Sequence, residues 1–162
     1  MNEEHRAPSE PHTSNGDRWS PNDGDRVIRS QSEAETATIA ADLARRLPHG
    51  TVVLLEGGLG AGKTAFVRGF VAGVGVDPDE VTSPTFTVIQ EYGGGRVYHV
   101  DLYRLESGEV DDLGLEELPE QGAFVCIEWA DRLTDPVSGA ISVQIIDQGD
   151  DVRELRIRYS DR

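Results

Sequence analysis

The sequence contains very little cysteine and very little lysine. Only one of its 162 residues is cysteine, Cys126, so no disulfide can form within the chain, and no His/Cys cluster with zinc-binding spacing is present. Cys126 lies in the apolar run 124–127, where a lone cysteine is either a small core residue or a reactive thiol. The burial habit of cysteine favours the core. The 15 basic residues comprise 14 arginines and one lysine, Lys63.

Long hydrophobic runs are also missing. No segment approaches the ~18 consecutive apolar residues that a membrane-spanning helix needs. The N-terminal MNEEHRAPSEPH lacks the apolar stretch of a secretory signal, so we expect a cytoplasmic protein. The formal net charge of −15 disfavours independent binding to nucleic acid, because phosphates repel an acidic surface. A local basic patch is available at Arg153, Arg156 and Arg158, but we expect RNA to be held only with the help of a partner.

Composition divides the chain into a tail and one domain. Residues 1–25 are polar and rich in Pro, Ser, Asp and Gly, which predicts a disordered tail; the alternative is a docking arm anchored by Trp19. Residues 26–160 are sufficient for a single domain with one moderate core. Ser32 and Glu35 match a capping box, which predicts the start of a helix.

Apolar patterning predicts the elements of this domain. Strands are expected at 27–28, 51–56, 85–92, 96–101 and 123–127, and a C-terminal hairpin at 141–147 and 153–159. Helices are expected at 32–47 and 63–72, with short helices in 102–120. The pattern is α/β with a mixed central sheet, in which antiparallel hairpins lie beside parallel strands.

The segment Gly57–Thr64 matches the phosphate-binding pattern G-x-x-x-x-G-K-[ST] in full, between a predicted buried strand and a predicted helix. Its glycines let backbone N–H groups turn toward phosphate oxygens, and the helix N-terminus adds further N–H groups. Lys63 is predicted to reach the β- and γ-phosphates, and Thr64 to ligate Mg²⁺. We therefore expect a P-loop NTPase-like three-layer sandwich that binds ATP. The predicted nucleotide contacts here are Leu59, Gly60, Ala61, Gly62, Lys63, Thr64 and Ala65.

Two apolar runs end in an acidic residue, because 97–100 leads to Asp101 and 124–127 leads to Glu128. The carboxyl ends of parallel strands share an edge with the phosphate loop, so both acids can converge on a magnesium ion. We assign Asp101 to the magnesium shell, and Glu128 to the attacking water and the γ-phosphate, with metal contact as a further role. The alternative for each is a cap of a following helix, and spacing does not decide which acid touches the metal. Together with Lys63, these acids are the predicted catalytic residues.

Three other positions have open interpretations. The segment Ser83-Pro84-Thr85-Phe86 is either a switch that senses the γ-phosphate, with the Thr85 hydroxyl directed at metal or water, or a proline-fixed strand start. Trp129 either stacks on the nucleotide base or is an ordinary core or rim aromatic. His99 alternates with apolar neighbours and is interpreted as a satisfied strand histidine.

Three rival functions fit the sequence less well. A small-molecule kinase needs a lid with arginines, but 102–120 is acidic and contains only Arg104. A GTPase needs an N-K-x-D segment, which is absent because Lys63 is the only lysine. A non-catalytic nucleotide-binding module would not need Lys63, Thr64 and both strand-end acids together.

Four motifs in this order resemble one family. GGLGAGKTAFVRGF, SPTF, HVDLYRL and IEWADRL occur at separations similar to those of the bacterial TsaE (YjeE) ATPases, over about residues 26–160. The resemblance implies an ATPase, with ATP and Mg²⁺ as cofactors, that serves threonylcarbamoyl modification of adenosine 37 in tRNAs reading codons that begin with A. It implies TsaD and TsaB as partners, tRNA contact only through that complex, and no membrane. ATP hydrolysis would reset the complex and would not make the adduct itself.

The resemblance also implies roles for single residues. Thr64 and Glu128 would bind magnesium, Asp101 would belong to the same centre, and Trp129 would lie near the nucleotide. Three further residues would approach the adenine side: Glu33, Thr36 and Arg153.

The sequence departs from the family pattern at two positions. Gly58 stands where an acid is common, and Ala130 stands where proline is common. Neither change removes a phosphate ligand, so the implied function is retained. Loss of the loop acid at Gly58 would bear on metal handling or partner contact.

Overall fold

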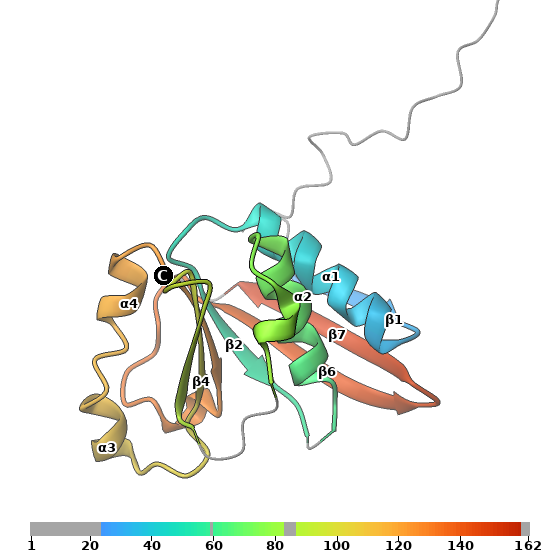
Figure 1. Ribbon diagram of the computed structural model, residues 1–162. Coiled ribbons are helices and arrows are strands. Elements are labelled where there is room, and N and C mark those ends of the chain that lie inside the picture. The colour runs from blue at the N-terminus through green and yellow to red at the C-terminus, as the bar shows by residue number, and fades with distance from the viewer. Residues whose placement is uncertain (1–23, 59, 83–86, 160–162) are drawn as a thin grey trace, which may run out of the picture.

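The computed structural model describes residues 24–58, 60–82 and 87–159. The predicted tail, 1–25, lies almost entirely outside this part of the chain, and so do Leu59, Ser83 and Thr85 among the predicted site residues. The described residues form one seven-stranded sheet with helices on both faces (Figure 1). No helix in this part of the chain combines the length and the apolar character that crossing a bilayer requires.

The sheet is mixed. Its strands lie in the order β1-β7-β6-β2-β5-β4-β3. The central strand β2 runs parallel to β5 and β6, and β5 runs parallel to β4, whereas the pairs β1–β7, β6–β7 and β3–β4 are antiparallel. The predicted α/β fold with antiparallel hairpins beside parallel strands is thereby confirmed. The strands are β1 (Arg26–Ser30), β2 (Val52–Glu56), β3 (Ile89–Tyr92), β4 (Val97–Asp101), β5 (Phe124–Glu128), β6 (Ile141–Gly149) and β7 (Val152–Tyr159).

The first helix begins where the capping box predicts. Ser32 Oγ accepts a hydrogen bond from the N–H of Glu35 at 3.1 Å, whereas the Glu35 carboxylate accepts at 3.0 Å from the N–H of Gln31, the residue before the N-cap, so the second bond of the predicted box is displaced by one residue. The helices of the described residues are α1 (Glu33–Arg46), α2 (Lys63–Gly73), α3 (Ser107–Asp111) and α4 (Glu117–Glu120), with short 3₁₀ helices η3 (Pro78–Glu80) and η4 (Ala130–Arg132).

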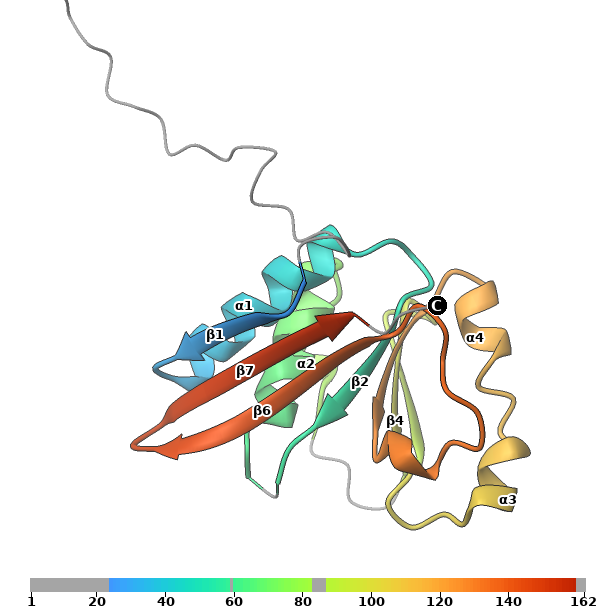
Figure 2. The same ribbon diagram turned by 180° about the vertical axis from the view of Figure 1, so that it is seen from behind.

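Side chains of β2 and β5 alternate between two hydrophobic clusters, because successive residues of a strand point to opposite faces. Val53 and Cys126 belong to the cluster beneath α1 and α2. Val52 and Val125 belong to the cluster that includes residues of α3 and α4. Figures 1 and 2 show the three layers that result, with α1 and α2 on one face of the sheet and α3 and α4 on the other. Burial on both faces explains why these strands read as continuous apolar runs.

The two acidic residues at the strand ends belong to the strands themselves. Asp101 is the last residue of β4 and Glu128 the last of β5, so hydrogen bonding in the sheet fixes both. The preceding strand β3 is shorter than the predicted 85–92. The backbone bends at Val88, whose carbonyl oxygen still accepts from the N–H of Asp101 at 2.8 Å before the ladder ends.

The C-terminal hairpin is longer than predicted. Asp150 and Asp151, the two turn residues, have φ of 51° and 63°. Positive φ at both positions matches the twist of the flanking strands, so pairing continues to Gly149 and Val152 beyond a register shift after Asp147. Near the start of β7, Arg153 Nε donates to the carbonyl oxygen of Ala61, in the segment that follows β2.

Candidate functional site

The segment between β2 and α2 begins at Gly57 and turns abruptly from strand into helix. A Cβ added at Gly57 would lie 3.0 Å from the carbonyl oxygen of Ile145 and 3.1 Å from Cβ of Ala61, so glycine allows the close approach to β6. Gly62, the N-cap of α2, has φ of 108°, a left-handed value that disfavours a side chain. The geometry brings the first N–H groups of α2, which have no partner within the helix itself, to this edge of the sheet.

Lys63 is held between this segment and β5. Its Nζ donates to the carbonyl oxygen of Gly57 at 3.0 Å and lies 3.1 Å from Oε1 of Glu128. The side chain is largely buried, at 18% exposure. The chain's only lysine and the last residue of β5 therefore form an ion pair, at the edge of the sheet where the parallel strands β2, β4 and β5 end.

Glu128 is buried and bonded through both oxygens. Oε2 lies 3.0 Å from Nε2 of His99, and Oε1 pairs with Lys63. Burial by itself raises the pKa of the Glu128 carboxyl, but the hydrogen bond and charge of His99, together with those of Lys63, outweigh it, so the pKa is lowered from its ordinary value. Glu128 is therefore an anion held in place by two cationic or donor groups.

His99 is a member of the site that the sequence interpretation missed. It lies in β4 and is buried and hydrogen-bonded, in agreement with the interpretation as a satisfied strand histidine, and its partner is Glu128. The sequence held half of the signal, because His99 and Asp101 are two residues apart on β4 and share a face; the register that aligns Asp101 with Glu128 came only from the structure. His99 is thus a diagonal neighbour of Glu128, at a distance that an imidazole ring can span.

Asp101 lies beside Glu128 on the same face of the sheet. The two residues are aligned in the β4–β5 ladder, and Leu55, aligned with Glu128 from β2, packs in the cluster beneath α2. Both acids therefore face the side of the sheet on which α2 begins. Asp101 Oδ1 accepts from the N–H of Tyr103 at 3.0 Å, so one of its oxygens stabilises the turn that follows β4, and helix α3 begins only at Ser107 with Glu106 as its N-cap.

The donor set near Lys63 suits a hard cation. Thr64, Asp101 and Glu128 offer hydroxyl and carboxylate oxygens, the ligands that Mg²⁺ prefers. In residues 24–58, 60–82 and 87–159, no three His, Cys, Asp or Glu side chains converge so as to hold a metal ion by themselves.

Arg153, which the resemblance assigns to the adenine side, contacts the backbone of the glycine-rich segment. Its Nε donates to the carbonyl oxygen of Ala61 at 2.8 Å, and Nη2 donates to that of Gly60 at 3.4 Å. Its Nη1 donates to Oδ1 of Asp147 at 2.9 Å. The first residues of β7 are thereby joined to the loop that precedes α2.

The other predicted nucleotide contacts lie in different environments. Thr36 is 1% exposed, and its hydroxyl is hydrogen-bonded to that of Ser30 at 2.7 Å, so it joins α1 to β1. Glu33 is exposed in the first turn of α1. Ala65 is partly buried in the first turn of α2.

Trp129 directly follows Glu128 and is not a core residue. Its side chain is 40% exposed, and its ring centroid lies 4.9 Å from that of Tyr103. Trp129 has φ of 61° and ψ of 45°, a left-handed conformation that is strained for a bulky side chain and that turns the chain sharply at the end of β5.

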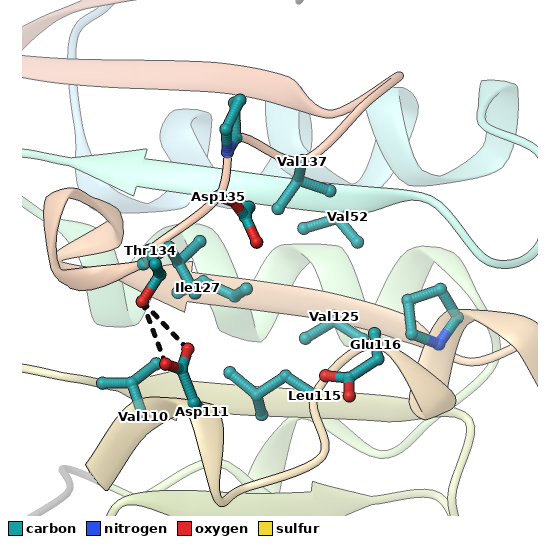
Figure 3. Close-up of a pocket in the computed structure, with 13 residues that line it drawn as sticks. Val52, Val110, Asp111, Leu115, Glu116, Val125, Ile127, Thr134, Asp135 and Val137 are labelled. Carbon is teal, nitrogen blue, oxygen red and sulfur yellow. Dashed lines mark hydrogen bonds between the residues drawn. The ribbon is translucent and has the colours of Figure 1, made fainter. Parts of the chain in front are cut away.

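A separate hollow of about 470 Å³ lies on the opposite face of the sheet (Figure 3). Val52 and Ile127 supply apolar lining from β2 and β5, and Asp111 also lines it, held by Thr134 Oγ1 at 2.9 Å. None of the described residues assigned above to the nucleotide or the metal lines this hollow. It is therefore not part of the candidate site.

Known proteins resemble this chain over most of its length. Residues 30–155 match the family model "Threonylcarbamoyl adenosine biosynthesis protein TsaE". A "tRNA threonylcarbamoyladenosine biosynthesis protein TsaE" from Bacillus subtilis is 41% identical over 130 residues, covering 78% of this chain and 81% of the relative. A protein of the same name from Treponema pallidum is 40% identical over 134 residues, covering 79% of this chain and 96% of the relative.

The fold agrees with this similarity. The crystal structure of YdiB from Bacillus subtilis superposes with a TM-score of 0.65 and 34% sequence identity, covering 83% of this chain and 85% of that one. The matched region contains the glycine-rich segment and both strand-end acids. The chain therefore belongs to the TsaE family of threonylcarbamoyl adenosine biosynthesis proteins.

Proposed function

We propose that this chain is the subunit that binds and hydrolyses ATP for threonylcarbamoyl modification of adenosine 37 in tRNAs reading codons that begin with A. Its partners in this proposal are the TsaD and TsaB homologues of the same organism, and its compartment is the cytoplasm. The observation that carries the proposal is the contact of 3.1 Å between Nζ of Lys63 and Oε1 of Glu128. The lysine of a phosphate-binding motif and the acid of a neighbouring strand end meet at one point.

Binding is assigned to the loop and the start of α2. Backbone N–H groups of this turn, the helix N-terminus and the Lys63 ammonium group would hold the phosphates. Lys63 would exchange its bonds to Gly57 and Glu128 for bonds to phosphate oxygens. Because a carboxylate and a phosphate oxygen are similar acceptors, this exchange requires only a small movement of the ammonium group.

Hydrolysis is assigned to the two acids. Glu128, ionised and fixed by His99, would orient a water molecule and accept its proton, while Asp101 and Thr64 would contribute oxygens toward a magnesium ion. Mg²⁺ bound with the triphosphate would neutralise charge on the phosphate oxygens. The exposed Trp129 and the adjacent Tyr103 border this edge and are available to a base or to a partner.

Partner proteins are part of the proposal because the chain is strongly acidic. A formal net charge of −15 opposes direct contact with the tRNA backbone, so tRNA would be reached through the complex. In this proposal, ATP hydrolysis by the chain would drive a conformational step of the assembly and would not make the adduct itself.

The test combines the purified chain with its TsaD and TsaB homologues. Phosphate release from Mg·ATP is measured for the chain alone and in the complex, with co-purification in the presence and absence of ATP. Modified tRNA is counted over many turnovers with a supplied threonylcarbamoyl donor. We expect phosphate release to rise with the partners and repeated modification to require ATP. Absence of any heat on titration with Mg·ATP, or repeated modification at an equal rate without this chain, would refute the proposal.

A further inference from the structure

The glycine-rich segment is held from behind by one side chain of β7. Arg153 donates from Nε to the carbonyl oxygen of Ala61 at 2.8 Å and from Nη2 to that of Gly60 at 3.4 Å. The two donors lie on one edge of the guanidinium plane and reach successive carbonyl groups, as only a forked side chain can. The contact joins residues that are 92 and 93 positions apart in the sequence.

A phosphate-binding loop has a particular need for such a contact. When backbone N–H groups turn toward a phosphate, the carbonyl groups of the same peptides turn away from it. A carbonyl of this kind needs a donor when it is buried, because a buried acceptor without a partner costs free energy; Ala61 is buried, whereas Gly60 is exposed. Arg153 supplies donors to the carbonyl oxygens of Ala61 and Gly60, and its positive charge lies beside them.

The guanidinium group is itself fixed. Arg153 is 14% exposed at its side chain, and Nη1 donates to Oδ1 of Asp147 at 2.9 Å and to the carbonyl oxygen of Val152 at 3.1 Å. Asp147 is aligned with Arg153 in the β6–β7 ladder, and its Oδ1 also accepts from the N–H of Gly149 at 2.8 Å. The hairpin therefore orients the carboxylate, and the carboxylate orients the guanidinium group.

From these contacts we propose that Arg153 is a positioning residue, anchored by Asp147, that holds the loop in its phosphate-binding shape. The inference deepens the proposed function and rests on it, because it explains how the loop that binds the triphosphate is pre-organised. It differs from a contact between Arg153 and the adenine base. A positioning residue supports the binding of any polyphosphate, whereas a base contact supports only nucleotides.

Affinities for two probes separate these roles. Mg·ATP and magnesium tripolyphosphate, which has no base, are titrated calorimetrically into the full chain and into the variants Arg153→Gln, Arg153→Lys and Asp147→Asn. We expect Arg153→Gln to weaken both probes by about tenfold, since it removes charge-assisted bonds to the loop. Arg153→Lys keeps the positive charge but lacks the planar guanidinium group, so its affinity for both probes should lie between those of the unmodified chain and Arg153→Gln. Asp147→Asn should weaken both probes by a few-fold.

The matched control is Arg156→Gln. Arg156 lies on the same strand, is 44% exposed and pairs with Glu154. We expect this variant to bind both probes as the unmodified chain does. Thermal unfolding of every variant is recorded, and if Arg153→Gln does not fold, the Arg153→Lys and Asp147→Asn variants decide the question.

A second readout needs no nucleotide. Amide hydrogen exchange at residues 60–64 should accelerate in Arg153→Gln and Asp147→Asn and remain unchanged in Arg156→Gln. Loss of ATP affinity with unchanged tripolyphosphate affinity would overturn the inference in favour of a base contact. Unchanged exchange and unchanged affinities in the folded variants would also overturn it. Failure of the unmodified chain to bind either probe would instead refute the proposed function, and the inference with it.

Discussion

The Nζ atom of Lys63 lies 3.1 Å from Oε1 of Glu128, so the first residue of α2 and the last residue of β5 form an ion pair across the end of the sheet. Both side chains are largely buried, and Glu128 is held on its other oxygen by His99. A partly buried pair of this kind is poorly screened by solvent, so removing either partner changes the site strongly.

Lys63→Ala should abolish detectable binding of Mg·ATP. The substitution removes the only lysine side chain of the sequence, and the loss of charge-assisted bonds to phosphate should weaken affinity by about 100-fold or more. Isothermal titration calorimetry measures the change. Arg45→Ala is the control, because Arg45 pairs with Asp42 on the exposed face of α1. Retained affinity in Lys63→Ala would remove this residue from the binding site.

Glu128→Gln should bind Mg·ATP within a few-fold of the unmodified chain but lose hydrolysis. Glutamine keeps the shape and one oxygen of the side chain but cannot accept a proton at neutral pH. Removal of a general base typically lowers turnover by about 10²–10⁴-fold. Phosphate release by the complex with the TsaD and TsaB homologues is the measurement, and Glu120→Gln, on the exposed surface of α4, is the control. Equal turnover in Glu128→Gln would exclude this acid from the reaction.

Glu128 should also contribute to the acid sensitivity of the fold. Its pKa is lowered from the ordinary value of 4.5, because the bonds and charges of His99 and Lys63 outweigh the effect of burial. The ionised form is thus favoured in the folded state, and the stabilisation is complete above the ordinary pKa and lost as pH falls through the folded pKa. The Tm of the unmodified chain should therefore fall more steeply below about pH 5 than that of Glu128→Gln. Parallel Tm curves for the two proteins would contradict the assignment.

Gly69→Ala should destabilise the fold. A Cβ at Gly69 would lie 2.0 Å from the carbonyl oxygen of Ala37, so α1 and α2 would have to move apart. A backbone clash in a packed interface should cost about 3 kcal/mol of unfolding free energy. Gly108→Ala is the matched control in α3, since no atom lies within 4 Å of the added Cβ, and it should gain about 0.5–1 kcal/mol. Urea unfolding of both variants and of the unmodified chain gives the free energies of unfolding. Equal stability of Gly69→Ala and the unmodified chain would show that α1 and α2 move apart without cost.

Cys126 should be unreactive in the folded protein. Burial raises the pKa of its thiol to about 12, and the nearby negative charge of Glu128 acts in the same direction. Because the thiolate is the reactive form, a disulfide reagent at about pH 8 should label the chain only after unfolding. Labelling in denaturant provides the control, with one equivalent expected. Labelling of the native protein at the rate of the unfolded chain would contradict the buried placement.

Local sequence was sufficient to predict the strands and the helix that carry the glycine-rich loop and the two strand-end acids. The match at Gly57–Thr64 is contiguous, and its strand–turn–helix context follows from neighbouring residues, so β2 and α2 could be predicted together. The same holds for Asp101 and Glu128, since each ends an apolar run. Boundaries were less predictable where pairing decided them, as at the shortened β3 and the extended β6–β7 hairpin.

Contacts between distant segments could not be read from local patterns. His99 looked like an ordinary strand histidine because its partner, Glu128, is 29 residues away, and only the β4–β5 register brings the two together. Arg153 and the loop it contacts are more than 90 residues apart, and the antiparallel return of β7 sets their distance.

The sequence by itself determined the phosphate-binding loop, the single ammonium group within it and the acids that end two strands, because each depends on residues adjacent in the chain. The tertiary structure decided which side chains stabilise them. Strand order and register place His99 on Glu128, and Arg153 behind Ala61, and these placements depend on how separate strands align in the folded sheet.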